Sequence, residues 1–412
     1  MHQLTNPWMS YAWGSPEKIP RLMCLSPGSL PVAEVWMGAH PAAPSQLEIN
    51  GRLVTLGDYI DAGPRHSLGH LAEHAVPGEL RAAHLPFMMK LLAANSSLSL
   101  RVHPTSAGAE QGFAREESVG LPIDHPARNF RDRSHKPEML YALSPFDLLA
   151  GFRAPKDIHA ALLSLAEPVG GTHAGRVPEP LRATLDALEH PVPGVALERA
   201  FGTLLRTAPG PAAALVSRVL AAAAGRPDAG PECALVSRLA DEHPGDLGAV
   251  AALFLSRHHL EPGQAVFVEA GVVHSYLGGL GVEVMSTSDN VLRAGLTPKR
   301  VSVPDLLRAV RFSPGRVAPV TGDPSFGGLL FAPPVRDFSL WVHDGSAATP
   351  AGATVAGPPA GPRIVVSCGS PVTVATEYQE VSLAPGGSAF IPDADGPIRL
   401  KSAGRVAIAM PG

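Results

Sequence analysis

Glycine and proline interrupt the first and last parts of the chain so often that only short stretches of regular structure fit between them. The sequence has 42 glycines and 43 prolines. Between these breaks lie short apolar runs at 53–56, 98–102 and 265–268, and then at 364–366, 372–374 and 406–408. Short strands with frequent turn residues are typical of β sandwiches and barrels. These parts of the chain are therefore predicted to form β structure.

The middle of the chain has a different composition, which favours helices. From about residue 155 to residue 258 it is rich in Ala, Leu, Arg and Glu. Leu197, Phe201 and Leu204 recur at the spacing of one helix face. Prolines at 191, 193, 209 and 211 divide the region into helices of modest length. We interpret it as a helical insertion into a β scaffold.

Composition and charge exclude several classes of partner. The formal net charge is -4 and no run of Lys or Arg occurs, so neither a nucleic acid nor a membrane surface is expected as a partner. The three cysteines, Cys24, Cys233 and Cys368, lie far apart, and the N-terminus lacks the apolar core of a signal peptide. We therefore expect a cytoplasmic protein.

Two histidines and a carboxylate are candidate metal ligands. His103 follows a predicted strand, Glu138 ends the segment H-K-P-E, and His274 follows the run 265–268. Taken singly, each histidine is more often a structural residue and H-K-P-E more often a solvated turn. Together they form a plausible His₂Glu set for Zn²⁺ with an open position for water or substrate. Their wide spacing in the sequence does not establish that they meet.

A segment from Glu283 to Lys299 combines acids with cations. It contains Asp289, Arg293 and Lys299 between glycine and proline breaks. The guanidinium fork matches phosphate or enediolate oxygens in bidentate geometry, and lysine supplies a point charge. The alternative is a surface loop with ordinary ion pairs.

Several segments of the chain resemble the type I mannose-6-phosphate isomerases. They occur in the order found in that family and cover roughly the first 150 residues and then about 260 to 310. The segments are Tyr11–Ser15, Ala33–Pro41, Leu98–Pro104, His135–Met139, His274–Leu277 and Ser288–Lys299. The last is long and highly specific. The helical middle and the C-terminal part match the family only in character.

The resemblance implies a mainly β fold, namely a cupin-type jelly-roll barrel with a helical insertion and a second C-terminal β barrel. We expect the catalytic cupin domain to comprise residues 1–152 and 259–316, the helical insertion residues 153–258, and the C-terminal barrel residues 317–412. The resemblance further implies one Zn²⁺ per chain, and we expect a monomer that acts on a small sugar phosphate.

The family's motifs also assign roles to individual residues. Its two metal histidines and its metal glutamate fall on His103, His274 and Glu138, and its catalytic arginine falls on Arg293. The resemblance places His135, Lys136 and Glu283 with Arg293 around the reacting carbons. A lysine needs a depressed pKa to act as a base near neutral pH, so His135 is the less demanding base. Substrate contacts are expected from Trp13, Glu34, Lys90, Ser99, Tyr276, Asp289 and Lys299, of which Lys90, Ser99 and Lys299 are the phosphate candidates.

One residue departs from the family pattern. The family usually has glutamine where this chain has Arg101. Residues two apart on a strand face the same side, so Arg101 should point to the same side as His103. Arginine has no acceptor atom, however, and cannot replace that metal ligand. The site could keep three protein ligands plus water, bind metal more weakly with Arg101 swung out or paired to Glu138, or lack the metal. We favour the first two together.

The main hypothesis is thus an isomerase that interconverts mannose 6-phosphate and fructose 6-phosphate through an enediol. A second hypothesis is a catalytically weak cupin that binds a sugar phosphate without turning it over. A third, a metal oxygenase, would need a compact H-x-H ligand pair, which Arg101 interrupts. Metal content together with an assay on mannose 6-phosphate separates these hypotheses.

Overall fold

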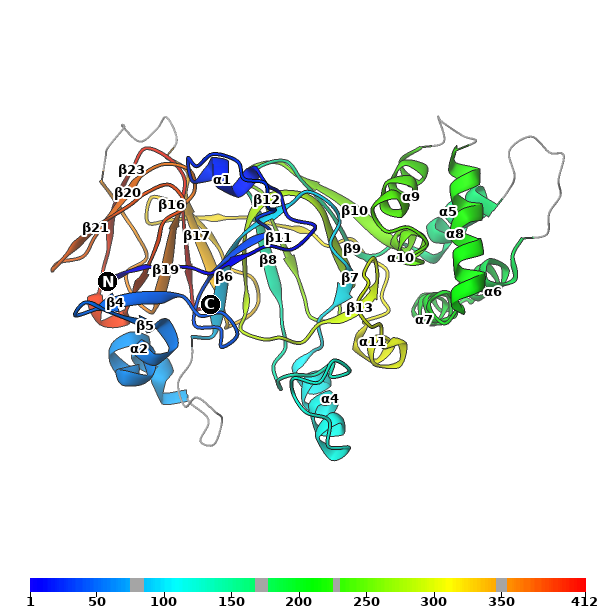
Figure 1. Cartoon of the computed structure of the whole chain (residues 1–412), viewed down its shortest axis with the longest axis horizontal. Helices are drawn as coiled ribbons and strands as arrows, with labels where there is room; N and C mark the ends of the chain where they lie inside the picture. The colour runs from blue at the N-terminus through cyan, green and yellow to red at the C-terminus, as the bar shows by residue number, and fades with distance from the viewer. Residues whose placement is uncertain (75–84, 167–176, 225–229, 346–353) are drawn as a thin grey trace.

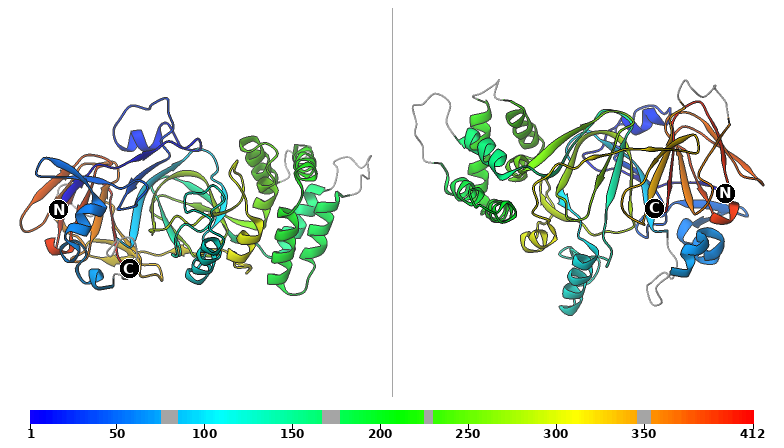
Figure 2. Two further views of the ribbon diagram at one scale, coloured as in Figure 1. Left: turned by 60° about the horizontal axis from the view of Figure 1, so that its bottom comes forward. Right: turned by 180° about the vertical axis from the view of Figure 1, so that it is seen from behind.

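The computed structural model describes residues 1–74, 85–166, 177–224, 230–345 and 354–412. Most of its strands lie in two large sheets at the centre and at one end of the molecule, and the helices of the middle region lie at the other end (Figures 1 and 2). The prediction of a mainly β protein with a helical segment is confirmed.

The central sheet has 11 strands and carries the candidate site. Its main path is β14 (Pro319–Val320), β11 (Ala265–Val268), β8 (Glu138–Ala142), β12 (His274–Ser286), β6 (Phe87–Ala94), β3 (Glu34–Met37) and β2 (Trp8–Met9). Four more strands branch from it, namely β7 (Leu100–Val102), β9 (Phe146–Phe152), β10 (Leu255–Leu260) and β13 (Leu292–Gly295). The described pairings run between two edges and do not close the sheet into a barrel.

The long strand β12 joins the two parts of this sheet. Its first residues pair with β7 and β9, and its later residues pair with β6 and β8. The change of partners coincides with a register shift between Tyr276 and Gly278. Gly279 follows at a φ of 138°, and a Cβ atom there would collide with the ring of Phe146. Only glycine fits that bend, so the sequence Gly278-Gly279 lets one strand serve both halves.

The second large sheet has seven strands and comes mainly from the C-terminal part of the chain. Its order is β1 (His2–Leu4), β22 (Ser388–Ile391), β19 (Arg363–Ser367), β24 (Val406–Met410), β17 (Ser339–His343), β16 (Gly328–Phe331) and β15 (Asp323–Ser325). A four-stranded sheet of β18 (Thr354–Ala356), β23 (Arg399–Ser402), β20 (Val372–Ala375) and β21 (Glu380–Leu383) accompanies it. A small hairpin is formed by β4 (Gln46–Ile49) and β5 (Arg52–Thr55).

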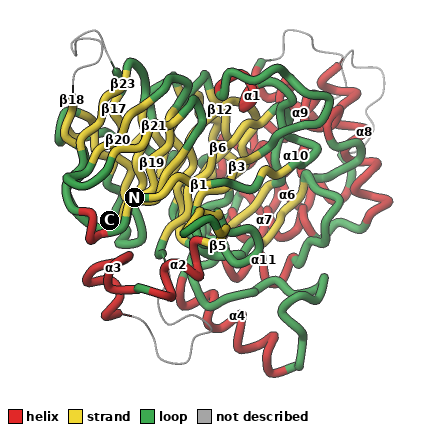
Figure 3. Tube along the Cα trace, turned by 60° about the vertical axis from the view of Figure 1, so that its left-hand side comes forward, coloured by secondary structure: helices red, strands yellow, loops and turns green. Residues whose placement is uncertain are grey.

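The two large sheets share a core, which the domain prediction did not anticipate. One apolar cluster includes Val282 and Val284 from the central sheet and Ile364 and Phe390 from the second sheet. The first strand of the chain, β1, pairs with β22, so the N-terminus lies beside C-terminal strands (Figure 3). Conversely, β14 lies in the predicted C-terminal barrel, which begins at residue 317, but it pairs with β11 of the central sheet. The chain therefore crosses between the sheets at its N-terminus and again just after the predicted boundary at residue 316.

Helices fill the middle region. They are α5 (Pro155–Ala166), α6 (Glu179–Leu188), α7 (Pro193–Leu205), α8 (Pro209–Ala224), α9 (Pro231–Glu242), α10 (Gly248–Ala251) and the 3₁₀ turn η2 (Ala252–Phe254). Proline in the first turn of most of them fits the missing N–H of that position. Residues 255–258, predicted to belong to the insertion, lie instead in β10, because this segment alternates in burial and pairs with β9.

The remaining helices are peripheral. They are α1 (Lys18–Leu22), α2 (Leu56–Ala62), α3 (Pro64–Leu68), α4 (Ser106–Ser118), α11 (Val303–Ala309) and the 3₁₀ turns η1 (Gly69–His74) and η3 (Asp393–Asp395). The predicted strand 53–56 ends one residue early, because Thr55 accepts the backbone N–H of Asp58 and caps α2. No helix in the described ranges is long and apolar enough to cross a membrane.

Candidate metal centre and active site

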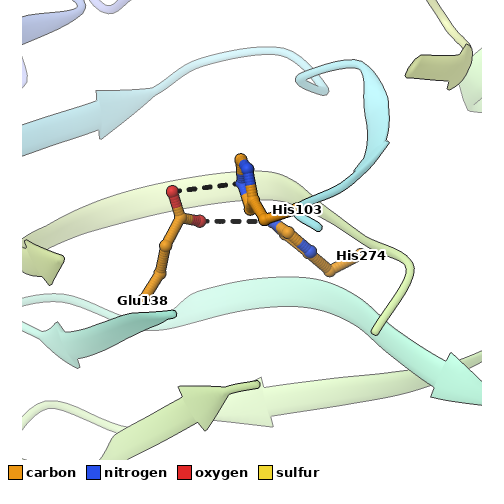
Figure 4. Close-up of side chains that lie close together, drawn as sticks. All are labelled: His103, Glu138 and His274. Atoms are coloured by element: carbon orange, nitrogen blue, oxygen red, sulfur yellow. Dashed lines mark ion pairs between the residues drawn. The ribbon is translucent and has the colours of Figure 1, made fainter. Parts of the chain in front are cut away.

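Three side chains from separate strands meet in the central sheet. His103 follows β7, Glu138 begins β8 and His274 begins β12. One ligand atom from each lies within 4.8 Å of the others, and all three residues are buried. The two carboxylate oxygens of Glu138 lie 3.2 Å from Nε2 of His103 and 3.2 Å from Nε2 of His274. Figure 4 shows the carboxylate facing both imidazole rings.

Backbone carbonyls fix the tautomers of both histidines. Nδ1 of His103 lies 2.7 Å from the carbonyl oxygen of Asn290, and Nδ1 of His274 lies 3.0 Å from that of Val272. A carbonyl only accepts, so each Nδ1 carries the proton and each Nε2 keeps its lone pair. Burial lowers the pKa of His103 to about 4, although Glu138 opposes the shift. Neutral imidazoles of this tautomer are suitable metal ligands.

The facing atoms need a cation. In this tautomer the two Nε2 atoms and the carboxylate oxygens are all acceptors, and Nε2 of His103, Nε2 of His274 and Oε2 of Glu138 are buried without a hydrogen-bond partner. Burial alone would raise the pKa of Glu138, but His103, His274 and Lys136 outweigh it and hold that pKa well below its usual range. Two neutral imidazoles and one carboxylate therefore fit a divalent ion with a preference for nitrogen ligands.

Carboxylates and ammonium groups form a buried layer beside these ligands, on β3, β6 and β12 and where the chain enters β8. Nζ of Lys90 lies 3.4 Å from Oε1 of Glu34 and 3.7 Å from Oε2 of Glu283. Nζ of Lys136 lies 3.7 Å from Oε1 of Glu138. Each cation in this layer thus has a carboxylate partner.

The layer shifts the pKa values of its members in different directions. Burial and the repulsion of Glu138 raise the pKa of Glu283 to about 7, although Lys90 opposes the shift. Burial lowers the pKa of Lys136 despite the attraction of Glu138. Burial also acts to lower the pKa of Lys90, but Glu34 and Glu283 outweigh it and the pKa is raised. Glu283 can therefore exchange a proton near neutral pH.

A second set of cations lies on β13 and around it. Burial and the repulsion of Arg101 and Arg131 lower the pKa of Arg293 to about 10. Burial, followed by Arg293 and Arg101, lowers the pKa of the exposed Lys299. Nε of Arg101 donates to the carbonyl oxygen of Ser99 at 3.3 Å. Within the described ranges Arg101 forms no ion pair with Glu138, in contrast to one of the sequence hypotheses.

The comparisons with known proteins agree on one family. A sequence model of the phosphomannose isomerase type I catalytic domain matches residues 1–155. The chain is 35% identical to a mannose-6-phosphate isomerase of Salmonella typhimurium over 99% of this chain and 98% of the relative. A human mannose-6-phosphate isomerase is 32% identical over 80% of this chain and 78% of the relative. A solved zinc-bound mannose 6-phosphate isomerase superimposes with a TM-score of 0.84 at 32% identity, covering 100% of this chain and 99% of the other.

The chain belongs to the type I mannose-6-phosphate isomerase family. Because the bacterial relative is matched over nearly its full length, the family likeness includes the helical middle and the C-terminal sheets, which the sequence motifs alone did not cover. A variant of phosphomannose isomerase from Salmonella typhimurium gives a TM-score of 0.85 at 32% identity over 100% of this chain and 99% of that one.

Three other residues singled out from this family's motifs, Tyr276, Trp13 and Asp289, have defined neighbours in the structure. Burial and the carboxylates of Glu283 and Glu138 raise the pKa of Tyr276 well above 10. The ring of Trp13 stacks on Tyr11 with centroids 5.6 Å apart, at the edge of an apolar cluster. Oδ1 of Asp289 lies 3.3 Å from Nε2 of His40, so this carboxylate has a partner within the protein.

His135 has a partner from the C-terminal part of the chain. Its Nε2 lies 3.1 Å from Oδ2 of Asp337, and the His135 side chain is 30% exposed. Burial would raise the pKa of Asp337, but His135 outweighs it and the pKa is lowered. The residues between β16 and β17 thus reach the segment that carries two predicted catalytic residues of the isomerase family.

Three residues near the centre were missed from the sequence. Asn290 is fully buried and binds the backbone of Asp132 and Ser134, while its carbonyl holds His103. Trp36 donates to Oε2 of Glu34 at 2.7 Å. Asn290 and Trp36 lie inside the family segments Ser288–Lys299 and Ala33–Pro41, so position in a motif could have indicated them. Asp337 lies in no such segment, and nothing local indicates it.

Proposed function

We propose that this chain is a zinc-dependent mannose-6-phosphate isomerase that interconverts mannose 6-phosphate and fructose 6-phosphate. The observation that carries the proposal is the buried His₂Glu set, in which two fixed Nε2 lone pairs and a carboxylate face one point. We assign His103, Glu138 and His274 as the ligands of one Zn²⁺, leaving a fourth position for substrate or water. Curated relatives of similar length carry this activity in their names.

We further propose that the central sheet forms a cupin-type jelly roll and the C-terminal strands a second barrel-like unit. The domain ranges 1–152 with 259–316, 153–258 and 317–412 remain predictions, with the sheet crossings noted above. Action in the cytoplasm as a monomer also remains a prediction; the wide separation of Cys24, Cys233 and Cys368 in the sequence fits a reducing compartment.

Aldose–ketose isomerisation moves a proton between C1 and C2 through an enediol. His103, Glu138 and His274 would hold a zinc ion, which when bound would supply Lewis-acid polarisation of a substrate oxygen. We assign the proton transfer to Glu283, because its pKa of about 7 allows it both to accept and to return a proton near neutral pH. Lys136, buried with a lowered pKa, is the competing candidate. His135 is engaged by Asp337 and lies at the rim.

The cations complete the assignment. Arg293 remains protonated at neutral pH even with its pKa at about 10, so it can stabilise negative charge on the enediolate or assist ring opening. Lys90 is held between Glu34 and Glu283, and we assign it to keeping those carboxylates in place rather than to binding phosphate. Glu34, Trp13, Tyr276 and Asp289 are assigned to substrate contacts, as the family motifs imply.

The test combines metal content with turnover. Purified protein is expected to contain about one zinc per chain and to convert mannose 6-phosphate in a coupled assay, to lose activity on chelation, and to regain it on zinc addition. Glu138→Ala should abolish both zinc binding and turnover. The matched control is Glu269→Ala, which removes an exposed carboxylate paired with Arg311 at 2.6 Å. Turnover that survives complete removal of metal would overturn the proposal, as would zinc-loaded protein without turnover, which favours a binding protein.

A further inference from the structure

Three residues stand side by side across neighbouring strands. In the antiparallel pairing of β12 with β7, His274 lies opposite Arg101. In the pairing of β7 with β13, Arg101 lies opposite Arg293. Side chains at directly opposite positions of antiparallel strands project from the same face. Arg101 therefore lies between a metal ligand and the predicted catalytic arginine.

The burial pattern shows which face this is. Leu100 and Val102 flank Arg101, Leu292 and Ala294 flank Arg293, and all four belong to the apolar core that includes the helices. Successive residues of a strand point to opposite faces, so Arg101 and Arg293 project away from that core. They share the face of His274 and are directed to the metal side of the sheet.

The cations around Arg101 differ in their partners from the lysines of the buried layer. Arg101 and Arg131 lie close enough to Arg293 to lower its pKa, and all three arginines lower the pKa of Lys299, in each case after the larger effect of burial. In the described part of the chain, Arg101, Arg131, Arg293 and Lys299 form no ion pair within 4.0 Å. Arg131 contributes to lowering the pKa of Asp289, but that carboxylate is paired with His40. Lys90 and Lys136, by contrast, are each held by carboxylates.

The charge count identifies the missing partner. The enediolate carries one transient negative charge, which needs at most one of these four cations in addition to the metal. A phosphate monoester carries about -1.5 to -2 charges at neutral pH, before and after the reaction. Arginine forks bind its oxygens in bidentate geometry. A dianionic phosphate is thus the ligand class that matches the remaining cations.

We propose that Arg101 and Arg131, together with Lys299, form the phosphate subsite of this chain, and that Arg101 is a substrate-anchoring residue rather than the remnant of a metal ligand. The inference rests on the proposed function for the identity of the sugar phosphate. Free orthophosphate presents the same dianion to Arg101 as the sugar phosphate does. Its binding can therefore be measured without turnover.

The first arm of the test measures orthophosphate binding by isothermal titration calorimetry, with zinc content matched in every sample. Arg101→Gln should weaken binding by about tenfold or more, the usual effect of removing one charge-assisted contact. Arg257→Gln is the control, because Arg257 is a partly exposed arginine on β10 that pairs with Asp147 at 3.6 Å. Equal phosphate affinity in wild type and Arg101→Gln would overturn the proposal.

The second arm measures steady-state kinetics on mannose 6-phosphate at saturating zinc. Arg101→Gln should raise KM about tenfold while kcat is largely kept, because a contact to phosphate is made equally in the ground and transition states. A fall in kcat at unchanged KM would overturn the assignment and place Arg101 at the reacting oxygens. If wild type shows no turnover, the proposed function fails, and the calorimetric arm still decides whether Arg101 binds phosphate.

Discussion

Nδ1 of His103 lies 2.7 Å from the carbonyl oxygen of Asn290. This contact determines which nitrogen of the ring carries the proton and therefore directs Nε2 to the metal position. The side chain of Asn290 holds its own backbone in place, since Nδ2 donates to the carbonyl oxygens of Asp132 and Ser134 at 2.9 Å each. The orientation of a metal ligand thus depends on a loop that lies on another part of the chain.

Asn290→Ala should therefore weaken both the fold and the metal site. It removes several hydrogen bonds in a fully buried position and leaves backbone groups of the loop unpaired. The free energy of unfolding is expected to fall by about 2–4 kcal/mol and zinc affinity by about tenfold. Urea denaturation and competitive zinc titration measure these effects. Asn129→Ala is the control, because that side chain makes one bond to Asp305. Unchanged zinc affinity in Asn290→Ala would refute the coupling.

The residue types of the metal centre could be read from the sequence because the chemistry is local to each segment. A histidine after a strand and a glutamate in H-K-P-E keep their character whatever surrounds them, and the ordered family segments supplied the grouping. The short strand 265–268 was equally local, and it coincides with β11.

Relationships that depend on strand register could not be read in this way. The alignment of Arg101 between His274 and Arg293 is set by two strand pairings between segments far apart in the sequence. The same holds for Lys90, predicted to bind phosphate, whose charge is taken up by Glu34 and Glu283 only because β3, β6 and β12 are neighbours. The entry of β1 into the C-terminal sheet is a further long-range pairing without a local signal.

Glu283→Gln should abolish the proton transfer while keeping the size of the side chain. Removal of a general acid–base group costs about 10²–10⁴ in kcat. In wild type, kcat/KM should rise with pH through about 7 as the carboxyl group ionises, and the variant should lose this limb of the profile. The kcat/KM values of the metal-loaded enzymes are compared from about pH 5.5 to about pH 9, where both are expected to remain folded. An unchanged profile with a small loss of rate would transfer the role to Lys136.

Arg293→Ala should lower kcat more than it raises KM. Its guanidinium is assigned to charge that develops during the reaction, and loss of such a group costs about 10²–10³ in kcat. Arg293→Lys keeps a charge without the planar fork and should recover part of the loss. Circular dichroism and zinc content establish that both variants are folded and loaded. A near-normal kcat in Arg293→Ala would contradict the assignment, and a pure KM effect would move Arg293 into the phosphate subsite.

Asp337→Asn tests whether the C-terminal part of the chain orients His135. The contact of 3.1 Å between them is expected to hold the segment that carries His135 and the neighbouring Lys136, so its loss should reduce kcat by about 3-fold to 30-fold. The lowered pKa of Asp337 means that the pair adds stability above the unfolded pKa and loses it as the pH falls through the folded pKa. The stability difference between wild type and variant should therefore begin to shrink near pH 4, the ordinary pKa of an aspartate, and vanish once the pH lies below the lowered pKa of the folded state. A difference that persists at lower pH would point to packing instead.

Arg101→Gln should tighten zinc binding even though it weakens phosphate binding. In this chain a fixed positive charge lies opposite His274 on the neighbouring strand, and it repels a divalent cation in a partly dry site. Glutamine removes the charge and offers an oxygen ligand.

Arg101→Met separates these contributions, because methionine removes the charge without supplying an oxygen. Competition against a chelator should give dissociation constants that fall from wild type to Arg101→Met to Arg101→Gln. The gain in activity should appear only at limiting zinc, since excess metal compensates by mass action. Equal dissociation constants in all three proteins would mean that the Arg101 guanidinium is directed away from the metal, and the repulsion argued here would be wrong.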